Sequence, residues 1–167
     1  MHQHKILLVD DSPNVLKALQ RTFRMEKYSI LCASSATEAM EILVNEDIDV
    51  IVSDENMPGV TGTELLMQVH DLYPEIIRMM LTGTTDVEVA KNAINRGEIW
   101  RFFTKPWDDF ELLTAVRQAL KMCNLDRENM QLKTEVKKQD IMLQRLEKEY
   151  PGITERSLAS DGSIIID

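Results

Sequence analysis

Several short apolar runs of this chain each lead into a residue that could take part in metal or phosphoryl chemistry. These residues are Asp10, Asp11, Asp54, Thr82 and Lys105. Carboxylates held close together repel and raise each other's pKa unless a cation lies between them. Mg²⁺ is the natural cation, because it takes hard oxygen ligands and keeps several waters. A lysine and a threonine opposite the metal would complete a phosphoryl site, where an in-line carboxylate could become an aspartyl phosphate.

Asp54 is the residue on which this hypothesis depends most. The apolar residues Val50–Val52 precede it, and Met57-Pro58-Gly59 breaks the chain soon afterwards. This pattern predicts a buried strand that ends in a loop, with the acid at the strand's carboxyl end. Open α/β sheets bind ligands at that edge. Taken alone, Asp54 could equally be a turn or capping residue, and each of the other four could be an ordinary polar side chain. Their shared position at strand ends favours a site.

The elements that must position these residues alternate between strands and helices. The expected strands cover residues 6–9, 28–33, 50–53, 76–81 and 100–104. The expected helices cover residues 13–23, 36–43, 61–70 and 87–96, with a fifth starting at 108. Such alternation implies a parallel sheet with helices on both faces, and right-handed crossovers leave few topologies. We expect an α/β fold with a flavodoxin-like, doubly wound, five-stranded parallel sheet in the order 2-1-3-4-5.

Length and charge limit the classes of function. The chain has 167 residues, a net charge of −9 and 44% hydrophobic residues, which predicts one domain with an extension. An acidic chain argues against nucleic-acid binding, which depends on basic patches. No apolar run is long enough to cross a membrane, and the run after the N-terminus is too short for a signal peptide. We therefore expect a cytoplasmic protein without nucleic-acid or membrane partners.

The cysteines and the N-terminal histidines give weaker signals. Cys32 and Cys123 show no metal-binding or CxxC spacing, so we expect reduced thiols. His2 and His4 could bind a metal, but two histidines near a chain end are more often inert.

The polar residues at the strand ends resemble a known family. Asp10-Asp11, Asp54 with Met57-Pro58 and Gly62, Thr82-Gly83 and Lys105-Pro106 together resemble the receiver (CheY-like) domain of two-component response regulators. The resemblance covers residues 4–121. It implies a phosphorylation switch that is not an enzyme beyond phosphorylating itself from phosphodonors and losing the phosphate again.

The resemblance also implies roles for individual residues. Asp54 would accept the phosphoryl group from a histidine kinase. Asp11, Asp54 and the backbone carbonyl of Asn56 would ligate Mg²⁺, with Asp10 acting mainly through water.

Further positions carry the switch in the family. Thr82 would contact the phosphoryl group and Lys105 would pair with it. Phe102 falls on the aromatic switch position and lacks the hydroxyl of the commoner tyrosine. Asn56 and Thr84 fall on positions that tune dephosphorylation. The signalling surface would be formed by the helix at 87–96, the strand at 100–104 and the helix from 108.

The last of these helices is expected to continue, because residues 122–150 contain no proline or glycine. Apolar residues recur there at coiled-coil spacing. The a positions are Met122, Asn129, Val136, Leu143 and Tyr150, and the d positions are Leu125, Leu132, Gln139 and Leu146. Asn129 favours a two-stranded register. We expect a homodimer through this helix; the alternatives are a helix folded back on its own domain or one paired with a different downstream protein.

Residues 151–167 follow a Pro-Gly break and read as a turn with a short β run. They could be a small hairpin, a docking segment or the start of a truncated output domain. The expected organisation is therefore a receiver at 1–121, a coiled-coil helix at 122–150 and a tail at 151–167.

Three other functions stay open. The chain could be the regulatory fragment of a larger protein with an output enzyme, such as an HD-GYP cyclic-di-GMP phosphodiesterase. It could be a Mg²⁺-dependent phosphohydrolase of the haloacid-dehalogenase type, although those enzymes need Asp-x-Asp and this chain has Asp54-Glu55-Asn56. It could also be a coiled-coil scaffold with a vestigial receiver, against which the complete set of polar residues argues.

Overall fold

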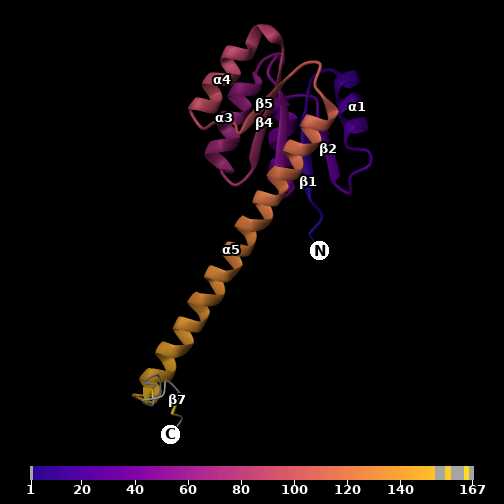
Figure 1. The fold of residues 1–167 in the computed structure, drawn as a ribbon. Helices are drawn as coiled ribbons and strands as arrows, with labels where there is room; N and C mark the ends of the chain where they lie inside the picture. Colours follow the sequence, from indigo (N-terminus) through magenta and orange to yellow (C-terminus); the bar gives the residue numbers. More distant parts are fainter. Residues whose placement is uncertain (1, 153–156, 159–163, 166–167) are drawn as a thin grey trace. The chain divides into compact units, whose positions relative to one another are not determined.

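The computed structural model describes residues 2–152, 157–158 and 164–165. It contains a five-stranded parallel sheet in the order β2-β1-β3-β4-β5, as expected (Figure 1). The strands are β1 Lys5–Val9, β2 Ser29–Ala33, β3 Val50–Asp54, β4 Ile77–Thr82 and β5 Arg101–Thr104. The helices are α1 Pro13–Thr22, α2 Ala36–Asn45, α3 Gly62–Leu72, the 3-10 turn η1 Thr84–Asp86, α4 Val87–Asn95 and α5 Asp109–Glu149. Element ends differ from the sequence prediction by only a few residues.

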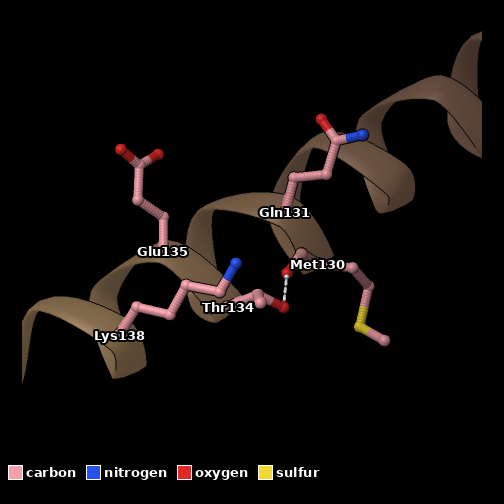
Figure 2. A pocket seen from close by; sticks show the side chains of 5 residues that line it. All are labelled: Met130, Gln131, Thr134, Glu135 and Lys138. Atoms are coloured by element: carbon pink, nitrogen blue, oxygen red, sulfur yellow. Dashed lines mark hydrogen bonds between the residues drawn. The ribbon is translucent and has the colours of Figure 1, made fainter. Parts of the chain in front are cut away.

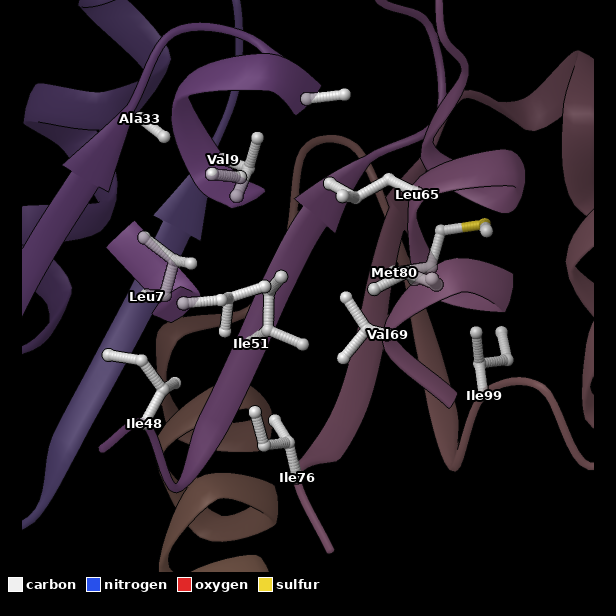
Figure 3. Close-up of a cluster of buried hydrophobic side chains, with 14 of the residues drawn as sticks. Leu7, Val9, Ala33, Ile48, Ile51, Leu65, Val69, Ile76, Met80 and Ile99 are labelled. Carbon is white, nitrogen blue, oxygen red and sulfur yellow. The ribbon is translucent and has the colours of Figure 1, made fainter. Parts of the chain in front are cut away.

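Alternate side chains of the central strands pack into two separate cores. Leu7 and Ile51 lie in the core shared with α2, α3 and α4 (Figure 3). Ile6 and Leu8 lie in the core shared with α1 and the first turns of α5. Because consecutive side chains of a strand point to opposite faces, strands buried on both sides must be apolar throughout. This explains the continuous apolar runs of β1, β3 and β4.

Local capping fixes where the helices near the carboxyl edge begin. Ser12 caps α1 by accepting the Val15 N–H, and Pro13 occupies the first turn, where it needs no donor. Thr61 and Glu64 form a capping box at the start of α3. Both helices therefore start directly beside the strand ends that carry the acidic residues.

The chain divides into two compact units, residues 1–123 and 124–167, with α5 running through the boundary. In the second unit, the short strands β6 Ser157–Leu158 and β7 Ile164–Ile165 pair antiparallel. Most of the tail lies outside the described residues, so the division into receiver, coiled coil and tail stays a prediction. Within the described residues, no helix is both long and apolar enough to cross a membrane.

Candidate functional site

The structure brings three of the expected carboxylates together at the carboxyl edge of the sheet. β1 and β3 are neighbours with Val9 opposite Ser53, so the residues that follow, Asp10 and Asp54, lie side by side. Carboxylate oxygens of Asp10, Asp11 and Asp54 all lie within 4.8 Å of one another. Asp10 and Asp54 are buried, whereas Asp11 is exposed. The cluster thus has two fixed acids at its base and one facing solvent.

Lys105 lies against the two buried acids. Its Nζ is 3.0 Å from Asp10 Oδ2 and 2.8 Å from Asp54 Oδ1. Burial alone would lower the pKa of Lys105, but the two carboxylates outweigh burial and raise that pKa above its ordinary value. Three carboxylates and one ammonium leave a formal charge of −2 when all are ionised, so the cluster can still accept a cation.

Burial dominates the electrostatics of Asp10. It raises the pKa of the Asp10 carboxyl, and the repulsion from Asp54 adds to it. The backbone N–H of Ser12, 2.9 Å from Asp10 Oδ1, and the Lys105 ammonium oppose this rise without cancelling it. The ionised form of Asp10 is therefore disfavoured in the folded protein, a condition that a bound cation would relieve.

Gly62 allows α3 to start against the end of β3. A Cβ at this position would lie 2.1 Å from the Asp54 carbonyl oxygen, far inside van der Waals contact. The Gly62 N–H instead donates to the Glu55 carbonyl at 2.9 Å. The motif glycine therefore sets how closely the α3 N-terminus approaches Asp54.

Glu55 is a positioning residue that sequence reasoning missed. Its Oε2 accepts the N–H of Thr63 at 2.8 Å and the Thr63 hydroxyl at 2.7 Å. Glu55 is buried, and burial raises the pKa of its carboxyl despite these two hydrogen bonds. The contact ties the residue after Asp54 to the first turn of α3. In the sequence, only its position next to Asp54 could have indicated that Glu55 has a positioning role.

The remaining expected residues surround this cluster. Thr82 is fully buried at the end of β4, and its hydroxyl donates to the Gly83 carbonyl at 3.2 Å. Thr84 is exposed at the start of η1. The Asn56 side chain donates to Asp86 Oδ2 at 2.7 Å and so links the loop after β3 to η1, a contact that the sequence did not predict.

Phe102 packs on the sheet face covered by α2, α3 and α4, where it is half-buried. Next to it, β5 and the first turns of α5 border an open depression. Its lining residues are Arg101, Phe102, Phe103, Phe110, Glu111 and Thr114. Phe110 is 73% exposed, so this surface presents an aromatic side chain to solvent.

The expected coiled-coil seam of α5 is mostly exposed. Leu125, Leu132 and Val136 each have more than half of their surface exposed, and only Leu146 among the seam residues is half-buried. The neighbouring surface of α5 carries an open groove (Figure 2). Its described lining residues all belong to α5: Met130, Gln131, Thr134, Glu135 and Lys138.

Comparisons with known proteins identify the domain. The family model described as "Response regulator receiver domain" matches residues 6–117. The hydrogenase transcriptional regulatory protein HoxA of Cupriavidus necator is 36% identical over 135 residues, covering 81% of this chain but only 28% of HoxA. The chain thus spans less than a third of this relative's length.

Solved structures agree in fold. The signal receiver domain of an HD domain-containing protein from Pseudomonas fluorescens Pf-5 has 39% identity and a TM-score of 0.70, covering 74% of this chain and 98% of that one. A structure titled adenylate cyclase from Rhodopirellula baltica has 30% identity and a TM-score of 0.74, covering 80% and 98%. The chain belongs to the response regulator receiver family of two-component signalling.

Proposed function

We propose that Asp54 is the phosphoacceptor of this receiver. The observation that carries the proposal is the position of its carboxylate, which is buried at the end of β3 between the Lys105 ammonium at 2.8 Å and the acids Asp10 and Asp11. A carboxylate can act as the nucleophile when neighbouring positive charge stabilises the oxygens of the transferred group. Lys105 supplies one such charge.

The donor set of the acidic cluster fits Mg²⁺. Asp10, Asp11 and Asp54 offer hard carboxylate oxygens within 4.8 Å of one another. We propose that Asp11, Asp54 and the backbone carbonyl of Asn56 ligate the metal directly, with Asp10 acting mainly through water. When bound, the metal would neutralise charge on the oxygens of the incoming phosphoryl group. The exposure of Asp11 leaves the cluster open to solvent and to a phosphodonor.

Two side chains have to change partners when Asp54 is modified. Lys105 now contacts Asp54 Oδ1, and it would pair with the phosphoryl oxygens instead. The Thr82 hydroxyl now donates to Gly83 and can rotate toward the same group. We propose that these exchanges shift an equilibrium between two conformations of α4, β5 and the start of α5. Phe102 would pack differently in the two conformations. Asn56 and Thr84, at the rim, would tune the lifetime of the phosphate.

Mass spectrometry tests the phosphoacceptor. With Mg²⁺ and acetyl phosphate, the wild-type chain should gain one phosphoryl group. Asp54→Asn should gain none while keeping its circular dichroism spectrum. Asp86→Asn is the matched control, because it removes a nearby carboxylate outside the three-acid cluster and should still be phosphorylated. The same mass gain in Asp54→Asn as in the wild type would refute the assignment.

We also propose that the phosphodonor in the cell is a histidine kinase and that the chain dimerises through α5. Receiver domains are phosphorylated by such kinases. The support for the dimer is the exposed apolar seam, which a second copy of the helix could cover. Leu132→Lys should lower the mass measured by light scattering to that of a monomer, whereas the adjacent off-seam change Gln131→Lys should not. A dimer that survives Leu132→Lys and deletion of residues 122–167 would place the contact on the receiver.

The output is a separate part of the proposal. The names of the relatives include a transcriptional regulatory protein, an HD domain-containing protein and an adenylate cyclase, so similarity does not select one output. We propose that this chain is the regulatory part of a signalling protein or acts on a downstream protein partner. Turnover of a free phosphate ester by the purified chain would instead favour a phosphohydrolase.

Light scattering with beryllofluoride, a phosphoryl mimic, separates two ways of signalling. A monomer that becomes a dimer would make α5 a phosphorylation-controlled interface. A dimer in both states would make α5 a permanent connection, with the signal carried by rearrangement within the pair.

A further inference from the structure

A second cluster of potential metal ligands lies at the amino ends of the strands, where β1 and β3 begin. His2 Nε2 is 3.4 Å and His4 Nδ1 is 3.2 Å from Asp49 Oδ2, and the three ligand atoms lie within 4.8 Å of one another. From their position near the chain end, both histidines are predicted to be inert. The structure instead places both against the buried carboxylate that precedes β3.

The strand pairing of β1 holds the cluster in place. The carbonyl of His4 accepts the Ser29 N–H at 2.8 Å, so His4 is hydrogen-bonded to the start of β2, directly before β1. Its ring lies edge-on to that of Tyr28, with centroids 6.5 Å apart. His2 and His4 are two residues apart, a spacing that puts both side chains on the same side of an extended chain.

The separations of the ligand atoms match those of a tetrahedral metal site. With metal–nitrogen and metal–oxygen bonds of about 2.0–2.2 Å, two ligand atoms of a tetrahedral zinc site lie about 3.4 Å apart. The two His–Asp separations are 3.2 and 3.4 Å, at or beyond the long end of hydrogen-bond distances. Asp49 Oδ2 also accepts the Lys5 N–H at 2.9 Å, which fixes the orientation of the carboxylate as outer contacts do for metal ligands.

The surrounding charge favours a cation. Glu46 and Asp47 lie near Asp49, and both raise the pKa of Lys5. The Lys5 ammonium is paired with Glu46 Oε2 at 2.6 Å. The Asp49 carboxylate lies beside both imidazoles, in an acidic stretch of the chain.

We propose that His2, His4 and Asp49 bind one divalent transition metal of the Zn²⁺ class, with the remaining coordination position open to water. Imidazole nitrogen suits zinc, copper and nickel, whereas the all-oxygen cluster around Asp54 suits magnesium. The metal would link the N-terminal segment to the start of β3 and so stabilise the folded unit of residues 1–123. This inference does not depend on the phosphorylation of Asp54.

Calorimetric titration of the full chain with Zn²⁺ tests the site. One Zn²⁺ should bind per chain, and both His2→Gln and His4→Gln should weaken binding at least tenfold. His2→Gln is the safer variant, since the His2 side chain is 40% exposed. The control is His70→Gln, which removes the third histidine of the chain and lies outside the cluster. It should leave the affinity unchanged.

Two further measurements separate this site from the acidic cluster around Asp54. Asp11→Asn should leave Zn²⁺ affinity unchanged if the metal sits on the histidines. Zn²⁺ should also raise the melting temperature of the wild type and of His70→Gln, but not that of His2→Gln. Equal affinity in the wild type, His2→Gln and His4→Gln would overturn the proposal, as would loss of binding in Asp11→Asn or no binding to the wild type at micromolar Zn²⁺.

Discussion

Replacing Asp10 by asparagine should stabilise the metal-free protein and weaken its stabilisation by Mg²⁺. Asparagine keeps the size of the side chain and an oxygen that can accept the Ser12 N–H, now 2.9 Å from Asp10 Oδ1. It removes a negative charge from a residue that is 1% exposed. Lys105 retains its contact with Asp54 at 2.8 Å, so the substitution leaves no ammonium without a partner.

The size of the effect follows from opposing terms. At an effective dielectric constant of about 20, the 3.0 Å pair of Asp10 and Lys105 gains about 5.5 kcal/mol, and repulsion between carboxylate oxygens no farther apart than 4.8 Å costs at least about 3.5 kcal/mol. Removing a carboxylate from water costs several kcal/mol more. With a desolvation cost of about 3–4 kcal/mol, the charge on Asp10 costs the folded state about 1–2 kcal/mol at neutral pH. The raised pKa of Asp10 has the same sign.

The raised pKa of Asp10 determines how the stability difference between Asp10→Asn and the wild type depends on pH. Because the pKa of Asp10 is higher in the folded than in the unfolded chain, protonation favours folding and ionisation opposes it. The advantage of Asp10→Asn should be complete above the raised pKa. It should vanish as the pH falls through that value and below the ordinary value of 3.8, where Asp10 of the wild type is itself neutral.

Urea unfolding followed by circular dichroism, with EDTA and with saturating Mg²⁺, measures the effect. In EDTA, Asp10→Asn should have the higher free energy of unfolding, by about 1–2 kcal/mol. Mg²⁺ should stabilise the wild type more than Asp10→Asn. Asp11→Asn is the matched control, because this exposed acid should change stability in EDTA by less than about 0.5 kcal/mol. A lower stability of Asp10→Asn in EDTA would refute the reasoning, since attraction to Lys105 would then exceed burial and repulsion.

Three other substitutions test the packing and charges of the chain. Gly62→Ala should lower the free energy of unfolding in urea by about 1–3 kcal/mol, because its Cβ would collide with the Asp54 carbonyl. Gly83→Ala is the control and should change this free energy little, because the nearest atom to its Cβ is 3.9 Å away. Lys105→Met should cost about 1–3 kcal/mol by leaving two buried acids uncompensated. In a pH series this cost should shrink above pH 10.5, as the pH passes the raised pKa of Lys105, and also at acid pH, where Asp10 becomes protonated. Asn129→Ile should raise the melting temperature of an α5 dimer in a concentration-dependent way, and an unchanged value at all concentrations would argue against a seam at this position.

The order of elements and the membership of the main site could be predicted from the sequence. Strands buried on both faces leave continuous apolar runs such as Ile6–Val9, and those runs end in the polar residues of the site. The positions of strands and their ends can be predicted locally, because both depend on the types of consecutive residues. Given alternating strands and helices, the parallel sheet and the meeting of Asp10 with Asp54 follow from topology.

The partners of each side chain were decided by tertiary structure. The sequence did not predict that the Lys105 ammonium contacts both Asp10 and Asp54, nor that burial is the main cause of the raised pKa of Asp10. The contact of Glu55 with Thr63 was likewise not foreseen. Such pairings depend on strand register and on rotamers in loops, which no local pattern specifies.

The N-terminal histidines illustrate the same division. Their spacing in the sequence gave no reason to connect them with Asp49, 45 residues beyond His4. The pairing of β1 with β3 brings the start of both strands together and so places the imidazoles at a buried carboxylate. Sequence patterns thus determined which residues are buried and where strands end, because those properties repeat along the chain. Only the folded sheet determined which distant side chains meet, because that depends on the three-dimensional register.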